Sequence, residues 1–167
     1  MRGIMGRLIA GAVACLVIVA VSAGADDKAE KIQPDKLPQK IKDAISARFP
    51  GAEVTSAEKE KENGEIVYDI ELKHEGLHYE MDIKEDGTVV EIEKEIKNPP
   101  EAITKAVKRK YPKATIKEVM EVNKVTGKEE KPEKYEVTIE IDGKTKEVIV
   151  SLDGKTVSGG GEEKKEK

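Results

Sequence analysis

The chain has 167 residues, which is enough for one ordinary domain or two very small ones. Charged residues make up 38% of it and hydrophobic residues 37%, with no Trp and a single Phe, so any core must be built mainly from Val, Ile, Leu and Ala. The formal net charge is −4, with the two signs interspersed. This charge argues against nucleic acid as a partner.

The first segment, residues 1–25, has the pattern of an export signal. Arg2 and Arg7 precede an apolar run of about 14 residues, "LIAGAVACLVIVAV", and Ala23 and Ala25 fit a small-residue cleavage site. The alternative is an uncleaved membrane anchor, but the run is shorter than the roughly 20 residues that span a bilayer. We therefore expect an exported protein, periplasmic or secreted, with no membrane attachment after cleavage.

Cleavage near Asp26 would change the chemistry of the chain. Cys15 lies inside the apolar run, so the mature protein would have no cysteine and neither a disulfide nor a thiol nucleophile. "AVAC" loosely resembles a lipidation site, but Cys15 lies midway through the apolar run, where a lipidated cysteine is not expected. Loss of Arg2 and Arg7 would lower the formal net charge from −4 to −6.

Residues 26–36 are expected to be a flexible lead-in, after which two similar segments follow. "LPQKIKDAISARFPGAEV" begins at Leu37 and "PPEAITKAVKRKYPKATI" begins at Pro99, with Pro38 and Pro100 in equivalent places. Each has an apolar stripe at helical spacing, Leu37, Ile41, Ala44, Ile45 and Phe49 in the first and Ile103, Ala106, Val107 and Tyr111 in the second. Pro50 and Pro112 should end the two helices, because the residue before a proline is disfavoured in the α region.

After each predicted helix the hydrophobic period changes to two. Tyr68, Ile70 and Leu72 alternate with charged residues, and "HEG" and "EDGT" supply turns between this strand and the next two. The same pattern begins again at Tyr135, with "IDGK" and "LDGK" as turns. "NKVTGKEEKPEK" lengthens the second segment by five residues and is interpreted as a polar loop that tolerates insertion.

These elements predict an α+β fold with two tandem units, residues 37–97 and 98–158. Each unit is expected to be one helix packed on one face of its own four-stranded antiparallel sheet, with the charged face in solvent. A unit of roughly 60 residues is marginal alone, so the units should join edge to edge or share packing. Residues 159–167 are expected to be a disordered charged tail.

The stretch from Leu37, with "GEIVYDIELKHEGLHYEMDIKEDGTVVEIE", resembles the PepSY-like domain, an exported bacterial module similar in fold to β-lactamase inhibitory protein. The resemblance covers both predicted units, although Pro99 and Lys113 depart from the pattern in the second. It implies an exported, tandem helix-plus-sheet protein. The related PepSY domain is associated with restraining secreted peptidases, and β-lactamase inhibitory protein docks a concave sheet on its enzyme. No contact residue of either can be matched here.

Few residues offer catalytic chemistry, and we expect no enzyme, no cofactor and no metal site. His74 and His78 flank one turn and could form a metal pair, but zinc needs three or four ligands. The Asp86-Gly87 and Asp153-Gly154 pairs lack the ligand spacing of a calcium loop and are interpreted as turns. The basic stretch "KAVKRKYPK" suits the end of a helix and its dipole.

The remaining candidate is the charged sheet face. The residues assigned to it are Asp69, Glu71, His78, Glu80, Asp82, Glu136 and Glu140. Two interpretations stay open for these residues, a solvated face and a surface that binds another exported protein or peptide, such as an extracytoplasmic enzyme or peptidase. An alternative function is a cation-binding or envelope sensor module that uses the same acidic residues.

Overall fold

A computed structural model describes residues 29–62 and 64–159. Nine antiparallel strands form one sheet in which spatial order follows chain order. The strands are β1 Glu30–Lys31, β2 Glu53–Glu62, β3 Glu65–His74, β4 Leu77–Lys84, β5 Val89–Glu95, β6 Thr115–Thr126, β7 Glu129–Ile141, β8 Lys144–Ser151 and β9 Val157–Ser158. A short 3-10 helix, η1 Pro34–Lys36, precedes α1 Gln39–Arg48, and α2 Glu101–Lys110 links β5 to β6.

Both α-helices begin and end where the prolines predict. α1 follows Pro38 and α2 follows Pro100, and each helix is ten residues long. Phe49 and Tyr111, one residue before the second proline, both have φ −128° and leave the helical region. The buried residues of the helices, Ile41, Ile45, Ile103, Ala106 and Val107, all belong to the predicted stripes.

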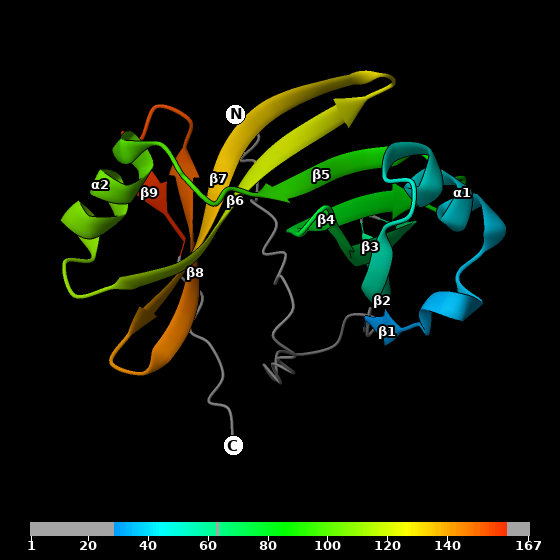
Figure 1. The fold of residues 1–167 in the computed structure, drawn as a ribbon, viewed down its shortest axis with the longest axis horizontal. Helices are drawn as coiled ribbons and strands as arrows, with labels where there is room; N and C mark the ends of the chain where they lie inside the picture. The colour runs from blue at the N-terminus through cyan, green and yellow to red at the C-terminus, as the bar shows by residue number, and fades with distance from the viewer. Residues whose placement is uncertain (1–28, 63, 160–167) are drawn as a thin grey trace.

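The helices lie toward opposite ends of the sheet (Figure 1). Side chains that alternate along the strands pack beneath them in two apolar clusters. One cluster joins Ile41 of α1 to Ile70 and Met81, and the other joins Ile103 of α2 to Val137 and Val148. The strand register places both clusters on the same face of the sheet, which leaves the opposite face to the charged positions.

The prediction of two tandem helix-plus-four-stranded units is wrong. β5 pairs with β6 over Glu91 to Glu95, so hydrogen bonding runs without a break from β1 to β9. The nine strands therefore form one large sheet that carries two helices, rather than two four-stranded sheets. Periodicity within a strand does not specify its neighbour, and here the paired edges satisfy backbone groups that two separate sheets would leave open.

The segment interpreted as a polar loop is strand in the structure. β6 and β7 extend through it as a long hairpin that turns at Gly127 and reaches toward α1 (Figure 1). Val125 belongs to the apolar cluster beneath α1, and Arg48 at the end of α1 pairs with Glu130 and donates to the Gly127 carbonyl at 3.5 Å. The hairpin thus ties the second half of the chain to the first helix.

The predicted export signal and most of the predicted tail lie outside the described residues. Within the predicted lead-in, β1 pairs with β2 and Ile32 donates to the Ala57 carbonyl at 2.9 Å. In the part of the chain that the structure describes, no helix has both the length and the apolar character that a membrane crossing requires.

Candidate functional site: the acidic face of the sheet

The acidic face is the side of the sheet turned away from α1 and α2. Alternation along β3 and β4, and along β5 from Glu91 onward, places one apolar set toward the helices and one charged set away from them. The acidic residues of these three strands on this face include Asp69, Glu71, Glu80, Asp82, Glu91, Glu93 and Glu95. β7 adds Glu136 and Glu140.

The strand register puts like charges directly opposite one another. Asp69 pairs with Asp82, and Asp82 with Glu91. One step along, Glu71 pairs with Glu80 and Glu80 with Glu93. Residues in such positions have Cβ atoms about 4.5–5.5 Å apart, and like charges there destabilise a sheet. The folded chain therefore tolerates an unfavourable arrangement along three neighbouring strands.

Several of these carboxyl groups are buried rather than solvated. Exposed fractions are 5% for Glu80, 4% for Asp82, 4% for Glu93 and 3% for Glu136. A hollow in this face is lined by Asp69, Glu80, Met81, Asp82, Glu91 and Glu93. A solvated face was one of the two interpretations of the sequence, but these four side chains are not in solvent.

Burial changes the proton affinity of the cluster. Burial, reinforced by the charge of Asp82, raises the pKa of Asp69 to about 8. Burial, together with neighbouring carboxylates, also raises the pKa of Glu80 and of Glu93 well above the ordinary range. At neutral pH these carboxyl groups therefore hold protons that they would release in water.

Glu136 lies at the margin of the cluster beside a lysine. Lys134 forms a short hydrogen bond and ion pair with Glu136. Burial alone would lower the pKa of Lys134, but the hydrogen bond with Glu136 and the surrounding carboxylates raise it. Met120 and Val122 share this face with Glu95 and Glu93 and are buried there, outside the two apolar clusters.

His78 links β4 to two other strands. Its Nδ1 lies 3.0 Å from Glu118 Oε1 on β6, and its backbone N–H donates to Glu95 Oε2 at 3.1 Å. Its Nε2 lies 3.8 Å from Glu80 Oε1. The hydrogen bond with Glu118 raises the pKa of His78 against the effect of burial. His78 is therefore a cationic member of the acidic face whenever it is protonated.

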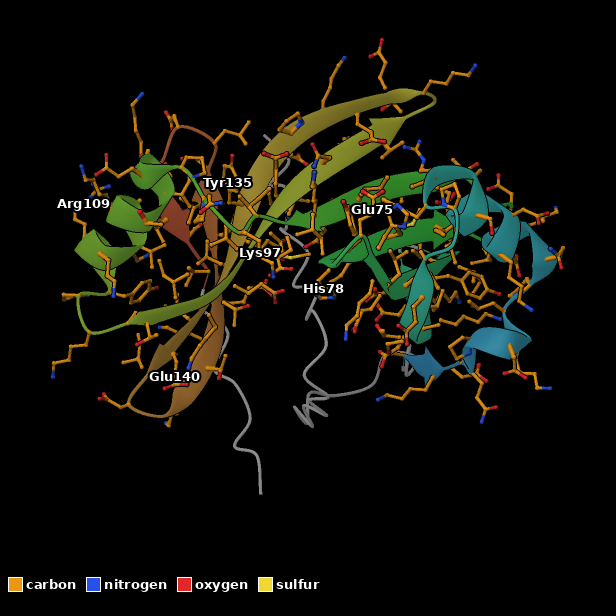
Figure 2. All side chains as sticks on the ribbon, in the orientation of Figure 1. Glu75, His78, Lys97, Arg109, Tyr135 and Glu140 are labelled. Atoms are coloured by element: carbon orange, nitrogen blue, oxygen red, sulfur yellow. The ribbon has the colours of Figure 1, made fainter. Side chains whose placement is uncertain are left out.

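The structure brings together six of the seven residues assigned to this face from the sequence. Asp69, Glu71, His78, Glu80, Asp82 and Glu136 lie within the group formed by β3, β4 and β7. Glu140 shares the face but lies outside this group, near the far end of β7, where it pairs with Lys117 at 2.8 Å. Figure 2 shows Glu140 well away from His78.

The sequence assignment missed Glu91 and Glu93, which line the hollow. Both follow the alternation of "VVEIEKE" around the buried Ile92, and this alternation was available in the sequence. What the sequence lacked was the position of β5 beside β4. That position places Glu91 opposite Asp82 and Glu93 opposite Glu80.

The other metal and anion candidates have local roles. Asp86 Oδ1 accepts from the Thr88 N–H at 2.8 Å, and Asp153 Oδ1 accepts from the Lys155 N–H at 3.0 Å, which is turn chemistry. Lys110 at the end of α2 donates to the Val157 carbonyl at 2.6 Å. Among residues 29–62 and 64–159, no three Asp, Glu, His or Cys side chains are placed to hold a metal ion.

Comparisons with known proteins show the fold alone. No protein-family model matches the sequence, and no curated protein matches it. Among solved structures, a BLIP-like protein from Bacteroides fragilis is 20% identical, with 75% of this chain and 87% of that chain covered and a TM-score of 0.50. A DUF2874 family protein from Bacteroides uniformis is 12% identical, with 75% and 89% covered and a TM-score of 0.55. A protein from Bacteroides eggerthii described as periplasmic is 11% identical, with 75% and 88% covered and a TM-score of 0.56. The chain thus has the fold of BLIP-like proteins.

Proposed function

We propose that this chain is an exported, non-enzymatic binding module that engages another extracytoplasmic protein or peptide through its acidic face. One observation carries the proposal. Buried carboxyl groups stand opposite one another on the face that neither helix covers, at a cost to stability that the fold does not require. Proteins accept such local conflict mainly at functional sites.

Export is supported by the residue pattern of the first 25 residues and by the fold. Solved proteins with this fold include one described as periplasmic and one described as BLIP-like. The resemblance to the PepSY-like domain supports the same location and a role in binding or inhibiting an enzyme or peptidase. The acidic face is the surface through which such a partner would be held.

Site-specific photo-crosslinking in the source cells tests this proposal. A crosslinking amino acid replaces Lys73, an exposed residue on the same side of β3 as Asp69 and Glu71. A control protein carries the same amino acid in place of Lys105, on the exposed side of α2. We expect the Lys73 probe to yield a discrete protein adduct that the Lys105 probe does not. Equal adducts from both positions, or none from Lys73, would contradict binding at this face.

A cation-binding or envelope sensor function is the second candidate, and the excess of carboxyl groups in the hollow favours it. Calorimetric titration with calcium and zinc distinguishes the two functions. Saturable heat at micromolar metal, lost in Glu93→Gln, would support a metal sensor. The arrangement of the described residues does not provide three converging ligands, so we expect no such heat.

A further inference from the structure

The outer side of α2 and the turn after it carry a cluster of positive charges. Residues 101–113 contain five basic residues and one acidic residue, in a chain whose formal net charge is −4. All five basic residues are exposed. They are named here the cationic end: Lys105, Lys108, Arg109, Lys110 and Lys113. Such a concentration of one sign, in a chain of mixed charge, favours contact with an anionic partner.

The end of α2 does not need this many cations. α1 and α2 are each ten residues long, and each is followed by a residue with φ −128°. The last turn of α1 contains one basic residue, Arg48, whereas the last turn of α2 contains Lys108, Arg109 and Lys110. In α1 a single cation therefore accompanies the same helix ending, although both helices have the same kind of dipole. The additional cations of α2 are not explained by the helix end.

The hydrogen bonds of the cationic end do not cancel its charge. Arg109 donates to the Gly154 carbonyl at 3.4 Å and Lys110 donates to the Val157 carbonyl at 2.6 Å. Lys108 also donates to a backbone carbonyl. A carbonyl oxygen carries no net charge, so these bonds position the side chains and leave the positive charges in place. The charges can then act on anions outside the protein.

The turn between β8 and β9 adds an apolar side chain beside these cations. Leu152 is 44% exposed, and among residues 29–62 and 64–159 it is the one large hydrophobic side chain that is exposed. The backbone of Gly154, two residues further on, packs against Ala102 in the first turn of α2 and accepts from Arg109. An exposed leucine bordered by lysine and arginine side chains suits a surface that rests on lipid headgroups.

The place of α2 in the fold favours a broad partner over a small ligand. α2 lies at one end of the sheet and its outer side projects from the molecule, and Arg109 lies at this end, far from His78 (Figures 1 and 2). Most of the cations are lysines, which are point charges on flexible stems and select no bidentate geometry. A bilayer of anionic phospholipids fits this arrangement better than a folded acidic protein, whose binding usually depends on aromatic or arginine anchors seated in pockets.

We propose that the α2 end of the protein docks on an anionic phospholipid surface, with the cationic end at the headgroups and Leu152 at the interface. The acidic face lies on the side of the sheet away from α2, so it is turned away from the lipid. Its repulsion is further screened, because the Debye length is about 10 Å at 0.1 M salt. Such docking is a reversible contact of the exported protein, and it departs from the expectation of no membrane attachment after cleavage. It does not require a partner at the acidic face.

Co-sedimentation with lipid vesicles tests this proposal. The protein is expressed with its complete leader and recovered from the extracytoplasmic fraction. Vesicles consist of phosphatidylcholine alone, or of phosphatidylcholine with about one-third phosphatidylglycerol. We expect binding to the anionic vesicles that falls several-fold between about 0.05 and about 0.5 M salt, because the contact is electrostatic. We expect little binding to the neutral vesicles, which also report any membrane affinity of an uncleaved leader.

Two double variants of equal charge locate the contact. Arg109→Gln with Lys113→Gln should weaken binding to the anionic vesicles about tenfold or more, since each cation near an anionic surface contributes several-fold to binding. Lys36→Gln with Lys40→Gln removes the same formal charge from exposed residues before and within α1, and should leave binding within about twofold. Circular dichroism checks that both proteins are folded.

Leu152→Ser tests the apolar part of the contact. We expect it to weaken binding about threefold, and to do so at low and at high salt alike, because burial of an apolar side chain does not depend on ionic strength. Binding as tight as that of the wild type would overturn the role of Leu152.

The outcomes also separate this docking from the proposed function. Equal sedimentation with neutral and anionic vesicles, or equal loss of binding in the two double variants, overturns the proposed docking. Binding of soluble polyglutamate without binding of vesicles would indicate an acidic protein as the partner of α2, and also overturns it. The proposed function is judged by protein adducts at Lys73. A lipid adduct at Lys105 together with a protein adduct at Lys73 would support both.

Discussion

At the scale of single residues, Glu93 combines burial with neighbouring carboxylates that disfavour its ionised form. Its ionised form is disfavoured in the folded chain and free in the unfolded chain, so it lowers stability once the pH exceeds its ordinary value. We expect Glu93→Gln to raise the free energy of unfolding at pH 8 by about 1–3 kcal/mol, since a shift of one unit corresponds to about 1.4 kcal/mol.

Urea unfolding followed by circular dichroism measures this difference. The matched control is Glu133→Gln, which should change stability by less than about 0.5 kcal/mol because the residue is exposed. Equal stability of the wild type and Glu93→Gln at pH 8 would mean that ionising the buried Glu93 carboxyl group does not destabilise the folded chain.

At the scale of elements, the Asp-Gly turns support the helices. Gly154 has φ 67°, and a Cβ there would lie 2.8 Å from the Ala102 carbonyl oxygen in the first turn of α2. Gly143 has a similar φ of 74° but open space around it. We expect Gly143→Ala to cost about 1 kcal/mol from backbone strain alone, and Gly154→Ala about 2–5 kcal/mol because α2 must also move.

Thermal and urea unfolding of the two glycine variants check this expectation. The pair isolates the packing of the turn against the helix, because the backbone conformation is nearly the same at both positions. A loss at Gly143 as large as the loss at Gly154 would show that strain, and not contact with α2, sets the requirement for glycine.

The β6–β7 hairpin is the second element whose role can be tested. Val125 is buried beneath α1, so Val125→Ala should cost about 1–3 kcal/mol and loosen α1, whereas Thr126→Ala on the exposed side should cost little. Amide hydrogen exchange would show faster exchange in α1 for the first variant only. Unchanged exchange in α1 would mean that the hairpin does not stabilise the helix.

At the scale of the whole molecule, stability should fall as the pH rises from about 5 to 8. The pKa of Asp69 is raised from 3.8 to about 8, so the folded chain binds protons that the unfolded chain has already released across this window. Raised values at Glu80, Glu93 and His78 act in the same direction. The lowered pKa values of Asp86 and Glu95 oppose this trend only below about pH 4.5.

Urea midpoints measured between pH 4 and pH 9 check the sign. We expect the highest midpoint near pH 5 and a decline toward pH 8 that becomes shallower in Asp69→Asn. A midpoint that rises from pH 5 to pH 8 would contradict the protonated state of the acidic face.

The local features of this structure, the helix boundaries and the inward-facing side chains, could be predicted from the sequence. The helix boundaries at Pro38, Pro50, Pro100 and Pro112 and the inward set of each strand follow from backbone sterics and periodicity. The acidic face was identified for the same reason, since a shift of one residue would have buried its charges against the helices. Glu140 lies on this face but far from the cluster, because alternation assigns a side and gives no distance along the strand.

The sequence by itself determined where the helices stop, where the Glu-Gly and Asp-Gly hairpins turn and which side chains face the core, because these depend on neighbours within a few residues. Only the tertiary structure decided that β5 pairs with β6 into one sheet, that the β6–β7 hairpin reaches α1, and that Glu93 faces Glu80 from a buried position. Those features depend on contacts between distant segments. Their free energy comes from burial and strand pairing across the whole sheet, which local periodicity does not encode.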